Sequence, residues 1–130
     1  MRDAAEYLSH IRALIALMPQ IVHCQVLREE AQGDTGLFRY RLSLRDDSSL
    51  EVFELFQVVD GEIKTRKYSF HWQDSQSGLI KRWDNAAHHP EVITHPHHVH
   101  KGAESNVLSH QSVDIEVILS IVNSNSDVDV

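Results

Sequence analysis

The stretch "LFRYRLSLRDDSSLEVFELFQVVDGEIKTRKYSFHWQ", residues 37–73, decides the fold. It contains three segments in which apolar and polar side chains alternate, as they do along strands with one buried face. Asp-Asp-Ser-Ser at 46–49 separates the first two segments, and Asp60-Gly61, a strong signal for a two-residue hairpin, separates the last two. Connections this short join antiparallel neighbours, so residues 37–73 predict three consecutive strands of an antiparallel meander.

The flanking sequence adds a strand on each side. Residues 21–29, "IVHCQVLRE", alternate in the same way and predict a strand before the three. After them, "DSQSG" at 74–78 predicts a turn that leads into "LIKRWD" at 79–84. The sequence therefore predicts a meander of about five strands, with connections short enough to be hairpins.

A helix is expected at each end of the chain. Apolar residues recur at helical spacing over residues 3–18, and Asp3 followed by Glu6 resembles a capping box. A second apolar stripe predicts a helix over about residues 112–122, and residues 124–130 are expected to be a frayed tail. Both helices need an apolar surface to cover, which the sheet provides.

Together these elements predict an α+β fold, one domain over residues 1–130, with both helices packed on one face of an antiparallel sheet. The other face is left for function or for a partner. The formal net charge is −7, and no apolar run approaches the roughly 20 residues that a membrane helix needs. The first twenty residues carry early acidic side chains and an amphipathic pattern, unlike a signal peptide, so a cytoplasmic location is expected.

The stretch "RWDNAAHHPEVITHPHHVHK", residues 82–101, contains six of the ten histidines of the chain. It also belongs to the basic part of an acidic protein, because residues 61–101 carry six Lys or Arg and four Asp or Glu side chains. This local positive charge favours a phosphate-bearing ligand. The negative charge of the rest of the protein disfavours indiscriminate binding of nucleic acid.

The strands bring further polar side chains toward this stretch. If Phe70 and Trp72 contribute to the core, the alternation places His71 on the open face of the fourth strand. Arg82 and Asp84 share one face of the fifth strand, and the histidine-rich stretch continues from its end. Three segments therefore bring polar side chains to one edge of the sheet, where we expect the functional site.

The sequence resembles the TumE toxin family in the motifs "YSFHWQ" at 68–73, "LIKRWDNAAHHPEV" at 79–92 and "THPHHVHKG" at 94–102. It departs from the family pattern at Ala87, where a proline is common, and at His95, where an aromatic residue is common. His95 is therefore the histidine of this stretch least expected to be functional. The resemblance implies the toxin of a type II toxin-antitoxin pair, neutralised by contact with an antitoxin that is usually a helix-turn-helix protein.

The residue types of the site suit metal-independent cleavage of RNA. This reaction needs one group that takes the proton of the 2′-hydroxyl and a second that protonates the leaving 5′-oxygen, and histidine titrates near the working pH. We expect His71 and one of His88 or His89 to transfer the protons. Asp84 is expected to orient an imidazole.

Substrate binding is assigned to cationic and aromatic side chains around the same stretch. Cations contact phosphate, and aromatic rings stack on unpaired bases. We expect phosphate contacts from Arg82 and Lys101, and base stacking from Tyr68 or Trp83. The remaining candidates for contacts with RNA are the histidines at the end of the stretch, His97, His98 and His100.

A metal site is the first alternative, and it would make the protein a metal-dependent nuclease. Adjacent residues of an extended segment point to opposite faces, so neither His-His pair can direct both rings at one ion. His98 and His100 are able to share an ion, and a Zn²⁺ site would need one ligand from each histidine cluster plus Asp84. The sequence contains neither HExxH nor paired cysteines. We therefore expect no metal and no other cofactor.

The second alternative is a binding or regulatory module without chemistry. In that case the open face of the sheet and the histidine-rich stretch contact a protein partner, and Arg39, Arg41 and Arg45 contact its acidic surface. A ribonuclease requires the histidines for growth inhibition, whereas a binding module does not. The sequence leaves open whether the chain also forms a homo-oligomer.

Overall fold

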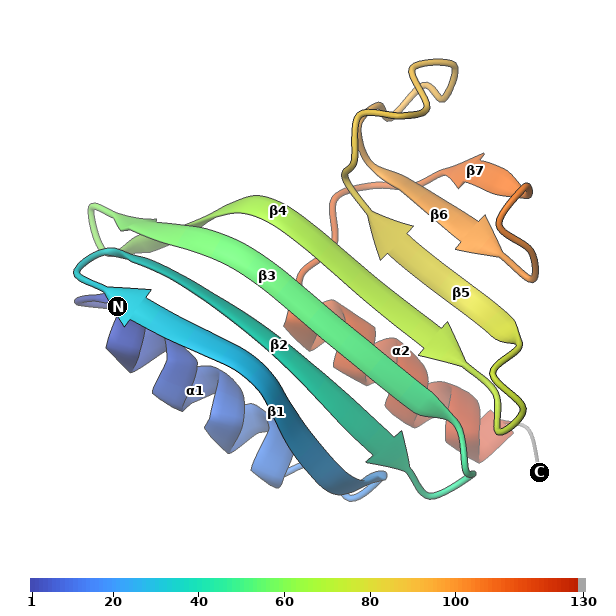
Figure 1. The fold of residues 1–130 in the computed structure, drawn as a ribbon, viewed down its shortest axis with the longest axis horizontal. Helices are drawn as coiled ribbons and strands as arrows, with labels where there is room; N and C mark the ends of the chain where they lie inside the picture. The colour runs from blue at the N-terminus through green and yellow to red at the C-terminus, as the bar shows by residue number, and fades with distance from the viewer. Residues whose placement is uncertain (129–130) are drawn as a thin grey trace.

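The structure, a computed structural model, describes residues 1–128 and forms one seven-stranded antiparallel sheet with two helices (Figure 1). The strands lie in the sheet in the order in which they occur in the chain. None of the helices within these residues has the length and apolar character needed to cross a membrane. The elements are α1 (Ala4–Ala16), β1 (Ile21–Gln32), β2 (Thr35–Leu44), β3 (Ser49–Val59), β4 (Glu62–Gln73), β5 (Leu79–Asp84), β6 (His98–Lys101), β7 (Val107–Ser109) and α2 (Ile115–Val128).

The predicted α+β meander is confirmed, and two short strands extend it. The hairpin at Asp60-Gly61 has both central residues at positive φ, 53° and 78°, as a two-residue turn matched to the twist of the strands requires. Strands β6 and β7 lie where the sequence pattern predicts no strand. The alternation over His98–Lys101 is only four residues long, and a pattern this short does not distinguish a strand from a loop.

The helix ends differ from the prediction by a few residues. The Asp3 side chain accepts a hydrogen bond from the Glu6 backbone N–H at 2.9 Å, so Asp3 is the N-cap of α1. Helix α2 begins at Ile115 and continues to Val128, through most of the segment expected to be a frayed tail. No Gly or Pro stands in this segment to stop a helix. Residues 129–130 of the predicted tail lie outside the described residues.

The core lies between the sheet and the two helices. From α1, Tyr7 packs edge-on against Phe56 of β3, with ring centroids 4.5 Å apart, and Ile118 of α2 is fully buried. His10 of α1 lies 3.3 Å from the Glu116 carboxylate of α2, so the helices are neighbours on the same face. One row of paired residues carries this core across the sheet: Tyr40, Val52, Phe70, Trp83 and Val99.

The residues between these core positions point to the opposite, helix-free face, called the open face below. Strand pairing sets them side by side, because directly opposed residues of antiparallel strands lie on the same face. One row on the open face crosses five strands and consists of Arg41, Glu51, His71, Arg82 and His100. The fold thus separates an apolar face from a charged one.

Candidate active site: a histidine cleft on the open face

A cleft of about 350 Å³ lies on the open face where β4, β5 and β6 meet the loop after β5. Five histidines, two carboxylates and two basic side chains contribute to its walls. We call it the histidine cleft. Its lining residues are Glu51, Lys67, Tyr68, Ser69, His71, Arg82, Asp84, Ala86, His88, His89, His98 and His100.

Strand register explains why these side chains meet. His71 of β4 pairs with Arg82 of β5, which pairs in turn with His100 of β6. The next row on the same face, two residues along each strand, joins Asp84 of β5 to His98 of β6. The period of two along each strand therefore places two charged rows next to each other.

The loop after β5 supplies the remaining histidines by folding back over the open face. The Asp84 carboxylate turns the chain by accepting the Ala86 backbone N–H at 3.0 Å, and Asn85 accepts the Tyr68 backbone N–H at 3.0 Å. His89 then packs edge-on against His98 and His100, at 4.9 Å and 5.5 Å between ring centroids. The tight turn after Asp84 thus brings a loop histidine onto two strand histidines.

Asp84 is the central carboxylate of the cleft. It is 6% exposed and accepts a hydrogen bond from Arg82 Nε at 3.1 Å. Its Oδ1 lies 2.9 Å from His98 Nε2, and its Oδ2 lies 3.6 Å from His100 Nε2. A buried charge needs such partners, and here they are a guanidinium and two imidazoles.

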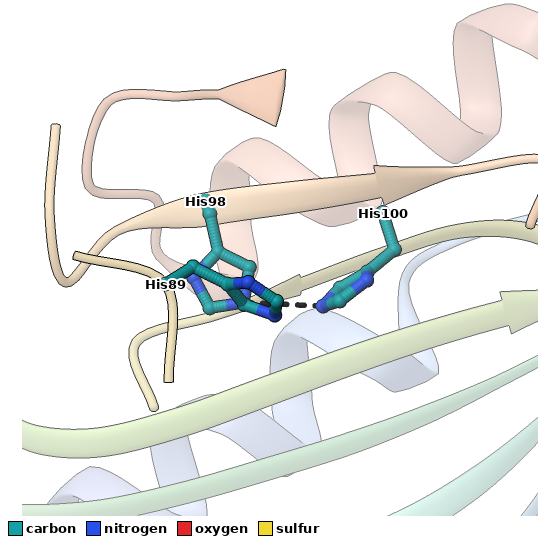
Figure 2. Close-up of side chains that lie close together, drawn as sticks. All are labelled: His89, His98 and His100. Atoms are coloured by element: carbon teal, nitrogen blue, oxygen red, sulfur yellow. Dashed lines mark hydrogen bonds between the residues drawn. The ribbon is translucent and has the colours of Figure 1, made fainter. Parts of the chain in front are cut away.

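The three clustered histidines have their Nδ1 atoms bound to oxygens. His98 Nδ1 lies 2.9 Å from the Pro96 carbonyl oxygen, and His100 Nδ1 lies 2.8 Å from that of Glu104. His89 Nδ1 lies 2.9 Å from the Glu91 carboxylate. Since these oxygens only accept hydrogen bonds, each Nδ1 carries the proton. Figure 2 shows the rings directed toward one another, with Nε2 of His98 and His100 3.1 Å apart.

His71 lies at the β4 side of the cleft. Burial, followed by the nearby Arg82 guanidinium, lowers the pKa of His71 below its ordinary value. The ring is therefore neutral near pH 7 and able to accept a proton. Beside it, burial alone would raise the pKa of Glu51, but hydrogen bonds from Arg41 and Arg39 hold that pKa below its ordinary value.

Most of the candidate residues from the sequence come together here. His71, His88, His89 and Asp84, expected to be catalytic, all line the histidine cleft. Among the residues expected to bind substrate, the lining includes Arg82, Tyr68, His98 and His100.

Three candidates lie elsewhere. Lys101 pairs with Lys81 in a row on the opposite face of the sheet from His98 and His100. Trp83 is 2% exposed within the core and presents no ring face to solvent. The His97 ring stacks on Tyr68, and its Nδ1 lies 2.8 Å from the Tyr68 hydroxyl.

Sequence reasoning missed three polar residues of the cleft. Lys67 and Ser69 share the open face of β4 with His71, so the alternation that selected His71 also selects them. Glu51 comes from β3, and its place opposite His71 depends on a register that the sequence does not fix. Lys67 provides a cation at the cleft, which Lys101 does not.

Comparison with known proteins identifies a family. The family model described as Toxin TumE matches residues 11–125, which include both the sheet and the histidine cleft. No curated protein and no solved structure matches the chain. Because the match covers most of the sequence, this protein belongs to the TumE toxin family.

Proposed function

We propose that this toxin is a ribonuclease whose reaction takes place in the histidine cleft. Membership of a toxin family implies a cognate antitoxin and growth inhibition as the outcome. The proposal of RNA as the target rests on one observation: imidazoles, a carboxylate and cations of the open face line a single cavity. These are the groups that proton transfer at a phosphodiester requires.

His71 and His88 are the proposed pair for proton transfer. The lowered pKa of His71 favours the neutral ring that a general base needs. His88 is exposed at the loop side of the cleft, where a protonated imidazole can reach a leaving group. Neither ring is hydrogen-bonded to Asp84, so both are available to a substrate.

In the proposed reaction His71 takes the proton from the 2′-hydroxyl, and the 2′-oxygen attacks the phosphorus. The bond to the 5′-oxygen breaks, and His88 protonates that oxygen as it leaves. Arg82 and Lys67 stabilise the charged phosphorane, which electrostatic preorganisation favours. The products are a 2′,3′-cyclic phosphate and a free 5′-hydroxyl.

Purified protein incubated with RNA tests this proposal. We expect cleavage by the wild type, and a loss of about 10²–10⁴ in rate for His71→Ala and for His88→Ala. His23→Ala is the matched control, because His23 is an exposed histidine of β1 remote from the cleft in the strand order. Thermal melting of each variant separates lost chemistry from lost folding. Unchanged cleavage by both folded variants would refute the assignment.

The ends of the RNA fragments distinguish the two nuclease mechanisms. Attack by the 2′-oxygen leaves a cyclic phosphate, whereas attack by a metal-bound water leaves none. If no RNA is cleaved and the histidines are dispensable for growth inhibition, the binding-module alternative replaces the ribonuclease.

We further propose that the antitoxin is a helix-turn-helix protein that neutralises the toxin in the cytoplasm by direct contact. The basis is the resemblance of the motifs around the histidine cleft to this toxin family. Co-expression with the product of the adjacent open reading frame tests it. We expect a stable complex and restored growth, and a neighbour without a helix-turn-helix motif would overturn the proposal.

A further inference from the structure

We propose that His89, His98 and His100 bind one divalent transition-metal ion, with Zn²⁺ the best match. One ligand nitrogen from each of the three histidines lies within 4.8 Å of the others. The site goes beyond the proposed function, because a bound ion would add positive charge beside His71 and His88, which are not among its ligands. Its own test needs no RNA, so the two proposals can fail separately.

The protonation of the rings favours a metal. Each of the three Nδ1 atoms donates its proton to an oxygen, from Pro96, Glu104 or Glu91. The lone pairs of His89 and His100 therefore lie on Nε2, whereas His98 Nε2 faces a further acceptor, Asp84 Oδ1, at 2.9 Å. A histidine that binds a metal through one nitrogen typically donates the other N–H to a carbonyl or carboxylate in this way.

The distances also favour a metal. Two imidazole nitrogens bound to one tetrahedral Zn²⁺ lie about 3.3 Å apart, from Zn–N distances of about 2.0–2.1 Å. Nε2 of His98 and His100 are 3.1 Å apart. Two imidazole nitrogens at this separation need a positive charge between them. A shared proton is one such charge, and a metal ion is the other.

The charges around the cluster suit a cation. Three carboxylates contact the rings: Asp84 lies beside His98 and His100, Glu91 beside His89, and Glu104 beside His100 at 3.7 Å. One cation opposes them, because Arg82 Nη2 lies 3.1 Å from His100 Nε2 and donates to its lone pair. Arg82 also forms a salt bridge with Glu104 at the protein surface. Its guanidinium therefore keeps a carboxylate partner when a metal replaces its contact with His100.

The ligand set selects the metal. Imidazole nitrogens suit Zn²⁺, Cu²⁺, Ni²⁺ and Fe²⁺, whereas Mg²⁺ and Ca²⁺ prefer oxygen ligands. Three histidines match the protein ligands of a tetrahedral Zn²⁺ site whose fourth position is left for water or substrate. The cluster consists of His98 and His100 of β6 and His89 of the loop. None of the three is adjacent to another in the sequence, so their rings need not point to opposite faces.

Calorimetric titration of the chelator-treated full chain with Zn²⁺ tests the site. We expect one Zn²⁺ per chain and a loss in affinity of at least about 100-fold for His89→Ala and for His100→Gln, since even partners of metal ligands contribute about 10–100-fold. The control His23→Ala should bind as the wild type does. Arg82→Gln should bind at least as tightly as the wild type, because a competing cation is removed.

Folding is checked by thermal melting without metal. His89 has a side chain that is 28% exposed, so its removal threatens the core less than removal of the buried His100. A folded His89→Ala protein that binds Zn²⁺ with wild-type affinity would overturn the proposal. So would the absence of saturable binding to the wild type, and the two Nε2 atoms would then share a proton.

Discussion

Two buried carboxylates on opposite faces of the sheet have contrasting partners. Glu54, on the helix-covered face, is 2% exposed and accepts hydrogen bonds from the hydroxyls of Tyr7, at 2.6 Å, and Thr65. Among residues 1–128, Glu54 forms no salt bridge. Asp84, on the open face, is 6% exposed and contacts Arg82 and two histidines.

The difference shows that the partners of a buried carboxylate, and not its burial, indicate a site. Burial raises the pKa of Glu54, and only neutral hydroxyls oppose that effect, so the group favours its protonated form and acts within the packing of α1 on the sheet. Asp84 has cationic and titratable partners at the edge of a cleft. Four measurements test this contrast.

The largest effect is expected for Asp84→Ala. The substitution leaves His98 Nε2, Arg82 Nε and the Ala86 backbone N–H without the Asp84 acceptor. Removing one member of a buried charged network costs about 3 kcal/mol of unfolding free energy. Urea denaturation at pH 7 measures it. A loss below about 1 kcal/mol would show that the Asp84 network contributes little to the fold.

Tyr7→Phe should cost about 1–2 kcal/mol, because it deprives buried Glu54 of one of its two hydroxyl donors. Growth inhibition should persist, since Tyr7 lies on the helix-covered face. Tyr40→Phe is the matched control, because Tyr40 donates to Glu29, which Arg12 also binds. Equal losses of unfolding free energy in the two variants would show that a hydroxyl bound to the buried Glu54 contributes no more stability than one bound to Glu29.

A smaller effect, dependent on pH, is expected for Glu54→Gln. Because the folded pKa of Glu54 is raised, the wild type loses stability as pH rises from the ordinary carboxyl pKa through the raised value. Glutamine does not ionise, so the variant should gain stability relative to the wild type across that window. Glu51→Gln should show the opposite sign, because the pKa of Glu51 is lowered and its ionised form stabilises the fold. Unfolding free energies from about pH 3 to about pH 8 provide the comparison, because the window of Glu51 lies below the ordinary carboxyl pKa and that of Glu54 lies above it.

Glu104→Ala should have the smallest effect, about 0.5 kcal/mol or less. Its carboxylate pairs with Arg82 at the surface and is 56% exposed, and exposed pairs contribute little. The backbone carbonyl that binds His100 Nδ1 remains. A loss comparable to that of Asp84→Ala would contradict the view that the buried carboxylate organises the cleft.

The sequence predicted the fold well because local signals determine it. The alternation of apolar and polar residues predicted the strands. Asp60-Gly61 predicted a hairpin, and Asp3 predicted the start of α1. The cleft was predicted in part, because the alternation that puts His71 on the open face is also local. What was missed depends on pairing between strands, which places Glu51 at the cleft and Lys101 on the far face.

The histidine pairs illustrate the same limit. The sequence correctly separates His97, which stacks on Tyr68, from His98 of the cleft, because neighbours in an extended segment point apart. It does not show that a turn held by Asp84 brings His89 back over β6. That approach is made by a loop of irregular backbone, for which no periodic pattern exists.

The order of the strands across the sheet has a consequence for synthesis. Each strand pairs with the one made just before it, and folds with such local contacts form quickly while a chain grows from its N-terminus. Strands β1–β4 can pair before β5 and β6 leave the ribosome. Translation that stops short of Glu104, whose carbonyl holds His100, therefore yields a partial sheet without a complete histidine cleft.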